Sequence, residues 1–178
     1  MKQELFFGGF MLEHAIEQHI RKVVLEDDEL GVLMDPGELF WCYTCDRTFR
    51  GKNAPKHGRD HPGIYATPDN CIIYPKEWVL AEYKFTRKST KNAGEDHIDG
   101  CWRWELQIKG YCKMLAITKA ELWVHWTHGN WKPPFKPAGN VYELKFTKRE
   151  LKQQWEHFVS VAESEGMFKK GWELDDGR

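Results

Sequence analysis

The sequence has no long apolar run and no strong excess of charge of one sign. No stretch of its 178 residues approaches the ~18 consecutive apolar residues that span a bilayer, so we expect no membrane segment. Residues 1–19 carry acids and a histidine soon after a short apolar patch, without the small-residue cleavage site of a signal peptide. Five cysteines at irregular spacing do not form the paired framework of a secreted protein. These absences predict a cytoplasmic protein.

The charges that are present are unevenly distributed along the chain. The formal net charge is −1, so the bulk charge does not indicate a nucleic-acid binder. Residues 26–38 nevertheless hold six acids and no base, whereas residues 84–91 hold four basic residues and no acid, and a second basic stretch follows at 145–152. A neutral protein with such segments can present one basic face to phosphates, although charge alone favours ordinary solvated surfaces.

The composition and the hydrophobic pattern predict one folded α/β domain over residues 1–178. An apolar content of 41% with nine tryptophans is typical of a protein with a real core. Leu12, Ile16 and Ile20 recur at helical spacing and predict a helix over residues 9–25. The remaining pattern predicts strands over 63–69, 71–74, 78–86, 120–127 and 141–147, helices over 101–116 and 148–165, and an irregular insertion over 35–62. This order favours a mixed central β-sheet flanked by helices.

Two acids and a lysine form the most informative pattern. Asp69 is followed by Glu82 and Lys84, with a predicted hairpin turn near Pro75 between them. Side chains alternate along a strand, so Glu82 and Lys84 share a face, and the turn brings Asp69 beside Glu82. Adjacent carboxylates repel unless a hard divalent cation lies between them; such a cation can activate water at a scissile phosphate, where an ammonium stabilises developing charge. Glu-x-Lys alone is also the ordinary pattern of a solvated strand.

Polar residues on two predicted helices fit around this pair. Glu13 is a third acid on the first helix, with His14 beside it, and a helix packed against the hairpin would complete the metal's ligands. Gln107 and Tyr111 are four residues apart on the next helix, so they share a face and could hold the lysine, a metal-bound water or a DNA phosphate. Each residue also has a structural alternative, as a surface acid, a helix histidine or a core aromatic. The order and spacing of the whole set are what favour a site.

Together these residues resemble the PD-(D/E)xK nuclease superfamily. The resemblance is greatest to the branch of the RecB C-terminal nuclease domain, lambda-type exonucleases and CRISPR adaptation nucleases, and it covers roughly residues 9–160. The CRISPR members hold an iron–sulfur cluster with late cysteines, and since no cysteine follows Cys112 here we do not expect that cluster. The matching segments are Gly9 to Glu13, Thr67-Pro68-Asp69, Glu82-Tyr83-Lys84 and Gln107-Ile108-Lys109-Gly110-Tyr111.

The resemblance implies a fold, an activity and a set of site residues. The fold is a restriction-endonuclease-like core, and the activity is Mg²⁺- or Mn²⁺-dependent hydrolysis of DNA. An exonuclease acting on a duplex end or a single strand is favoured, and such a compact nuclease suits a bacterial or phage-infected host cell. The implied residues are the metal ligands Glu13 (ahead of His14), Asp69, Glu82 and the Tyr83 carbonyl, the catalytic lysine Lys84, and the branch motif Gln107 and Tyr111.

A second group of metal-binding residues lies in the insertion over 35–62. Cys42 and Cys45 are followed by His57 and His61, in the pattern C-x2-C-x11-H-x3-H. Thiolates and imidazoles are zinc ligands, and this spacing suits a closed tetrahedral site. The flanking aromatic residues resemble a two-Cys two-His zinc finger, but a proline and a glycine before the second histidine argue against a regular recognition helix. We therefore predict a structural Zn²⁺ that orders the insertion.

Two other functions fit the same residues. One is a structure-specific or restriction-like endonuclease with the same chemistry, which would cut a closed circle as well as a linear molecule. The other is a non-catalytic, zinc-containing nucleic-acid-binding module, which would bind DNA without cutting it. For any of these, Trp131, in a loop rich in lysine and proline, is the best candidate for stacking on an unpaired base.

Overall fold

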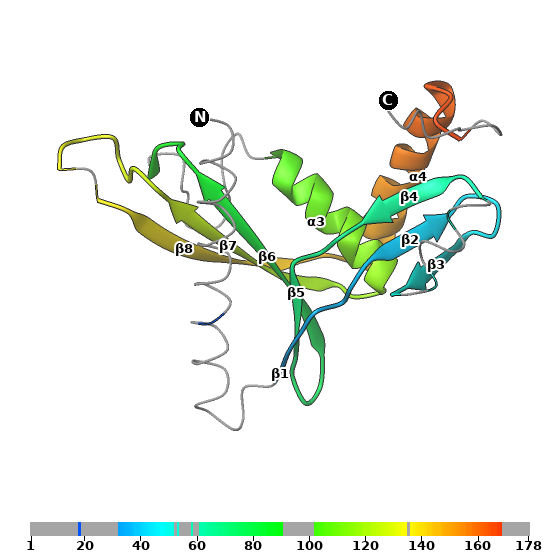
Figure 1. Ribbon diagram of the computed structural model, residues 1–178, viewed down its shortest axis with the longest axis horizontal. Coiled ribbons are helices and arrows are strands. Elements are labelled where there is room, and N and C mark those ends of the chain that lie inside the picture. The colour runs from blue at the N-terminus through cyan, green and yellow to red at the C-terminus, as the bar shows by residue number, and fades with distance from the viewer. Residues whose placement is uncertain are drawn as a thin grey trace, which may run out of the picture.

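Two sheets and the helices α3 and α4 make up the described part of the chain in the computed structural model (Figure 1). The structure describes Gln18, residues 32–51, Asn53, Gly58 and residues 61–90, 102–134 and 136–168. The predicted helix over 9–25 lies outside the described residues apart from Gln18, which is helical.

The larger sheet has five strands in the order β1-β5-β6-β7-β8. β6 and β7 are parallel, and the other neighbours are antiparallel. Helix α3 lies between β6 and β7 in the sequence. A parallel pair requires such a connection, because the chain must return to the end of the sheet where β6 began before β7 can start. The mixed central sheet of an α/β fold is thus confirmed. The bounds are β1 Val32–Met34, β5 Asn70–Ile73, β6 Trp78–Thr86, α3 Trp102–Leu115, β7 Lys119–Trp126 and β8 Ala138–Lys145.

The sequence patterns of β6 and β7 reflect how each strand is covered. β7 alternates strictly, with Ala120, Leu122 and Val124 buried and the residues between them partly exposed, as expected of a strand with one face in the core. β6 is buried continuously from Val79 to Tyr83, because both of its faces are covered. Glu82 falls within this buried run, which makes it the exceptional residue of the strand.

Helices α3 and α4 (Lys148–Ser164) pack together and against one face of the large sheet. Ile108 and Trp155, one from each helix, join the core that also contains Leu80 and Leu122 of the sheet. The predicted final helix is confirmed, and it begins with a capping box in which Thr147 and the glutamate three residues later satisfy each other's backbone N–H groups. Within the described residues, neither helix has the length and apolar character needed to cross a membrane.

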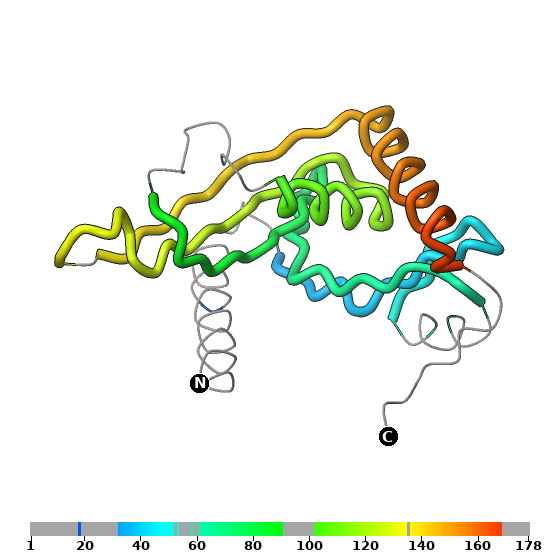
Figure 2. The backbone as a smooth tube through the Cα atoms, turned by 90° about the horizontal axis from the view of Figure 1, so that it is seen from above, coloured from blue at the N-terminus to red at the C-terminus, as the bar shows by residue number. Residues whose placement is uncertain are grey.

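The insertion over 35–62 was predicted to be irregular, and this prediction was wrong. It contributes β2 (Leu39–Cys42) and β3 (Arg47–Arg50), which pair with β4 (Gly63–Ala66) in a three-stranded antiparallel sheet of order β3-β2-β4. The turn residues that suggested a loop are the ends of a tight hairpin. In Figures 1 and 2 this sheet lies at the same end of the molecule as α4, and Leu39, Trp41 and Ala66 belong to the main core.

The strand predicted over 63–69 is shorter than expected. β4 ends at Ala66, and Asp69 lies in the link immediately before β5 rather than at the end of a strand. The hairpin of β5 and β6 turns at Pro75 as predicted. A short link therefore carries the chain directly from the small sheet to the first carboxylate of the large one.

Candidate functional site

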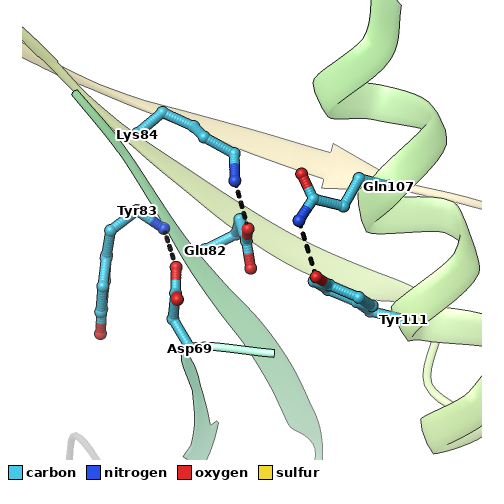
Figure 3. A network of polar contacts seen from close by, with 6 residues as sticks. All are labelled: Asp69, Glu82, Tyr83, Lys84, Gln107 and Tyr111. Atoms are coloured by element: carbon cyan, nitrogen blue, oxygen red, sulfur yellow. Dashed lines mark hydrogen bonds and ion pairs between the residues drawn. The ribbon is translucent and has the colours of Figure 1, made fainter. Parts of the chain in front are cut away.

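The hairpin of β5 and β6 brings Asp69 and Glu82 together. Asn70 pairs with Ala81 in the antiparallel register, so the preceding Asp69 and the following Glu82 lie opposite each other. The Asp69 carboxylate accepts a hydrogen bond from the backbone N–H of Tyr83, with an Oδ2 to N distance of 2.7 Å (Figure 3). This bond fixes the carboxylate at the start of β5 against the middle of β6, as the sequence pattern predicted.

Glu82 and Lys84 share a face of β6, as expected from their spacing. The Lys84 ammonium lies 2.5 Å from Glu82 Oε1 (Figure 3). The Glu82 side chain is only 2% exposed, whereas that of Lys84 is 18% exposed. The second carboxylate oxygen, Glu82 Oε2, is buried and has no hydrogen-bond partner among the described residues. One oxygen of a buried carboxylate is therefore available to a ligand.

Burial raises the pKa of both carboxyl groups. The pKa of Glu82 rises from 4.5 to about 7, mainly through burial, which the nearby Lys84 opposes and the negative charge of Asp69 reinforces. The pKa of Asp69 is also raised by burial, against the lowering effects of the Tyr83 N–H and Lys84. Repulsion from Asp69 contributes to the raised pKa of Glu82, but loss of hydration exceeds it. A cation held between the two groups would favour their charged forms.

Gln107 and Tyr111 project from α3 toward this pair, as Figure 3 shows. The Gln107 Nε2 amide donates to the Tyr111 hydroxyl oxygen over 2.6 Å. The pKa of Tyr111 is raised first by burial, with further contributions from the charges of Glu82 and Asp69. The phenol therefore stays neutral, and since its oxygen accepts from Gln107 its own proton is left to donate to another acceptor.

Of the remaining candidate ligands of this site, the structure describes Tyr83. Glu13 and His14 lie outside the described residues. The side chain of Tyr83 lies on the opposite face of β6 from Glu82, in a buried cluster with Ala81 (Figure 3). Its backbone N–H serves Asp69, and the role of its carbonyl as a ligand stays a prediction.

The arrangement combines groups that suit one kind of chemistry. Two converging carboxylates, one with an unpartnered oxygen, offer the hard donors that a divalent cation prefers. Lys84 places a positive charge 2.5 Å from Glu82 Oε1, and Tyr111 adds a hydroxyl donor from the other side. Such a site can hold a cation and an anionic group side by side.

The small sheet brings together three of the four residues predicted to bind zinc. Cys42 ends the central strand β2, Cys45 lies in the turn that follows, and His61 precedes β4. Their ligand atoms all lie within 4.8 Å of one another, so the three could hold a metal ion. The fourth predicted ligand, His57, lies outside the described residues.

The local geometry of the two cysteines suits a thiolate ligand. The backbone N–H of Cys45 donates to Cys42 Sγ over 3.3 Å, an interaction that stabilises negative charge on sulfur. The pKa of Cys45 is raised, mainly because it is hydrogen-bonded to Cys42. Metal binding would therefore release a proton from this pair.

Sequence reasoning missed the side chains that attach the small sheet to the helices. The Tyr43 hydroxyl donates to Glu163 Oε1 of α4 over 2.5 Å, and Arg50 Nη2 donates to the carbonyl oxygen of Leu115, the last residue of α3, over 3.1 Å. Trp41 packs edge-on against Trp155, with ring centroids 5.2 Å apart. No sequence signal pairs residues 65 and 120 positions apart, so these contacts needed the three-dimensional structure.

Comparisons with known proteins leave the function of these sites open. No protein-family model matches the chain, and no curated protein matches it. A solved structure, described as the crystal structure of SSO0001, aligns with a TM-score of 0.46 and 12% sequence identity. The alignment covers 86% of this chain and 59% of that one, so the chain spans less than two thirds of that protein's resolved length.

Proposed function

We propose that this protein is a metal-dependent nuclease that hydrolyses phosphodiester bonds in DNA at the site formed by Asp69, Glu82 and Lys84. The observation that carries the proposal is the buried Glu82 carboxylate, which has an unpartnered oxygen beside a second acid and a lysine. The order of a hairpin, a crossover helix and a parallel strand fits the restriction-endonuclease-like core that the sequence resemblance implies.

The energetics of the site favour a ligand over a purely structural role. Leaving a buried polar atom without a partner costs about 1–3 kcal/mol, and more where the group is charged. A structural ion pair would satisfy both oxygens of Glu82, whereas here Lys84 satisfies one. Groups held at such a cost, with raised pKa values, gather at functional sites.

Asp69 and Glu82 would hold Mg²⁺ or Mn²⁺, with Glu13 as a further ligand. When bound, the cation supplies Lewis-acid chemistry and lowers the pKa of water at the phosphate. Lys84 places its ammonium where negative charge develops as the phosphate is attacked. The Tyr83 N–H fixes the direction of the Asp69 carboxylate, and the Tyr111 hydroxyl, positioned by Gln107, donates toward the anionic group.

We further propose that the cysteine–histidine cluster holds a structural Zn²⁺, with His57 as the fourth ligand. Three donors whose ligand atoms lie within 4.8 Å of one another could share one ion, and their thiol and imidazole chemistry suits zinc. The small hairpin has little core of its own, namely Phe40, Cys42 and the neighbouring Phe49, so a metal would supply order that apolar packing does not. In this proposal the zinc unit is part of a single nuclease domain that works in the cytoplasm of a bacterium or a phage-infected cell.

The test of the nuclease is cleavage of end-labelled linear DNA and of closed circular DNA, each with Mg²⁺, Mn²⁺ or EDTA. We expect cleavage of the linear substrate with either metal, none with EDTA, and none of the closed circle, because an exonuclease needs an end. Lys84→Ala should cut the linear substrate about 100- to 1000-fold more slowly. Lys113→Ala, which removes an exposed lysine of α3, is the matched control and should keep the parental rate.

Each contrary result points to one alternative. Cutting of the closed circle would replace the exonuclease with an endonuclease of the same chemistry. Metal-independent binding without cleavage under any condition would leave a zinc-containing nucleic-acid-binding module. Cleavage by Lys84→Ala at the parental rate would remove this site from the reaction.

A further inference from the structure

The loop between β7 and β8 presents an exposed aromatic platform. The β7–β8 hairpin, yellow at its tip, projects away from α4 and the small sheet in both Figure 1 and Figure 2. Trp131, in the loop of residues 127–137, is 50% exposed. Its ring stacks on that of His128, with centroids 4.9 Å apart and an angle of 13° between the planes. One large aromatic surface is thus backed by a second, parallel ring.

Hydrogen bonds hold this platform in place. Trp131 Nε1 donates to the backbone carbonyl of Arg87 over 2.7 Å, and the N–H of Thr90 donates to the carbonyl of Gly129 over 2.9 Å. The tip is therefore tied to the segment that follows β6. An aromatic side chain whose polar edge is fixed while half of its surface stays exposed is preorganised for stacking, because little conformational entropy remains to be lost on binding.

The two segments that meet here carry positive charge only. No acid occurs in residues 83–94 or in residues 122–142, in a chain whose formal net charge is −1. Two basic side chains follow β6, Arg87 and Lys88, and two flank the proline pair of the loop, Lys132 and Lys136. A loop of this kind is complementary to a polyanion.

This surface continues toward the carboxylate site. Arg87 is five residues after Glu82, which corresponds to at most about 17 Å along an extended chain. Next to Arg87, the Lys88 ammonium lies 5.7 Å from the ring centroid of Trp104, which is one helical turn before Gln107 on α3. Basic and aromatic groups therefore lie at both ends of the path from the hairpin tip to the site.

We propose that the loop of residues 127–137 is a stacking platform for single-stranded DNA, which it holds on the path to the carboxylate site. The proposal deepens the nuclease function and rests on it for the identity of the nucleic acid. A single strand fits better than a duplex, because paired bases are stacked on each other and have no free face for Trp131. Stacking on an aromatic side chain combined with lysine contacts to phosphates is the general way of binding unpaired strands without sequence preference.

The test is binding of a short fluorescent oligo(dT), followed by anisotropy in a buffer without Mg²⁺, Mn²⁺ or chelator, so that cleavage plays no part and the zinc stays bound. Removal of a stacking aromatic costs about 1–3 kcal/mol per base, so Trp131→Ala should bind roughly 5- to 150-fold more weakly. The matched control is Trp78→Ala, which removes a tryptophan of similar exposure, 39%, at the opposite end of β6 and should bind normally. Lys132→Ala should reduce the salt dependence of binding by about one phosphate contact. Circular dichroism of each variant checks that it is folded.

The outcomes separate this inference from the nuclease itself. Parental affinity of a folded Trp131→Ala would overturn the platform, whether or not the protein cuts DNA, as would equal loss in the Trp78→Ala control. Tighter, Trp131-independent binding of a matched blunt duplex would also overturn it. If binding depends on Trp131 but no DNA is cut with Mg²⁺ or Mn²⁺, the platform stands and the nuclease fails.

Discussion

The carboxylate site and the cysteine–histidine cluster, the two metal sites that we propose, differ in almost every feature of their design. The first uses oxygen donors from the link before β5 and from β6, with Glu82 buried in the large sheet. The second uses sulfur and nitrogen donors around one hairpin of the small sheet, with Cys45 exposed and His61 partly exposed. Hard divalent cations suit the first set and zinc suits the second.

The two sites also differ in what the protein gains from a metal. At the carboxylates, strand pairing and the main core hold the surrounding chain, and the acids are held there at a cost, as the raised pKa of Glu82 indicates. At the cysteines the hairpin has only a small core, so a metal would contribute to folding. Removing a ligand should therefore abolish activity at the first site. At the second site it should lower the stability of the fold.

The largest effect is expected from Asp69→Asn. The amide keeps the shape and can still accept the Tyr83 N–H, but it removes a charge that would hold the cation. We expect cleavage to fall to the metal-free background while the melting temperature in EDTA stays the same or rises, because a buried charge has gone. Cleavage with Mn²⁺ and thermal unfolding measure the two effects. Asp35→Asn, in an exposed turn, is the control; parental cleavage by Asp69→Asn would falsify the assignment.

Lys84→Ala should act on the rate rather than on binding. Loss of a charge that stabilises the transition state typically lowers the rate about 100- to 1000-fold. Affinity for DNA should change by only a few-fold, because phosphate contacts elsewhere remain. Single-turnover rates and anisotropy measured on the same preparation separate the two quantities. A variant that loses affinity and rate in the same proportion would instead identify Lys84 as a binding residue.

Cys45→Ser tests the other side of the contrast. Elemental analysis should find about one zinc per chain in the parent, purified without added metal, and none in the variant. The variant should also unfold at lower temperature, and a chelator should lower the stability of the parent in the same way. Thr44→Ala, in the same exposed turn but without a ligand atom, should keep both zinc and stability. A zinc-free parent of undiminished stability would contradict the structural role.

The sequence was most informative where local patterns decide the structure. The strand over 120–127, the turn at Pro75 and the shared face of Glu82 and Lys84 each depend on neighbouring residues, and each was predicted correctly. The cysteine spacing likewise brought Cys42, Cys45 and His61 together as expected.

What the sequence could not provide depends on distant residues. The strands of the insertion were missed because β2 and β3 are short and lie among turn residues. The small sheet gains its third strand only when β2 pairs with β4, which lies beyond the insertion. The unpartnered oxygen of Glu82 follows from burial, which the Glu-x-Lys pattern does not encode. The His128–Trp131 stack needs the turn geometry, including a positive φ of 62° at Trp131.

The pH dependence of stability should identify Glu82 directly. Its pKa is about 7 in the folded protein and 4.5 ordinarily, so between these values the folded state binds the proton more strongly than the unfolded state. Its contribution to stability is therefore complete below about pH 4.5 and is lost as the pH rises through about 7, a fall of up to about 3 kcal/mol.

Urea unfolding across this pH range, without added Mg²⁺ or Mn²⁺ and without a chelator so that zinc stays bound, measures the effect. Glu82→Gln should flatten the slope of unfolding free energy against pH, leaving the smaller contribution of the same sign from Asp69. Saturating Mg²⁺ should remove this slope from the parent, because it favours the charged carboxylates. Glu156→Gln, on an exposed part of α4, should leave the slope unchanged. A slope that persists unaltered in Glu82→Gln would assign it to another group.

The smallest effect is expected at the connection between the two regions. Arg50 of β3 donates to the carbonyl of Leu115 at the end of α3, where helix carbonyls lack partners within the helix, so it ties the small sheet to the helix that carries Gln107 and Tyr111. Loss of this charged hydrogen bond in Arg50→Ala should cost about 1–2 kcal/mol, or a few degrees in melting temperature for a protein of this size. Arg149→Ala, an exposed arginine in the first turn of α4, is the control. If the two sheets unfold as one unit, Arg50→Ala lowers a single transition in the zinc-loaded protein and leaves the zinc content unchanged. A separate early transition, with the main transition at an unchanged temperature, would mean that the small sheet folds independently and that zinc stabilises only the hairpin that carries the cysteines.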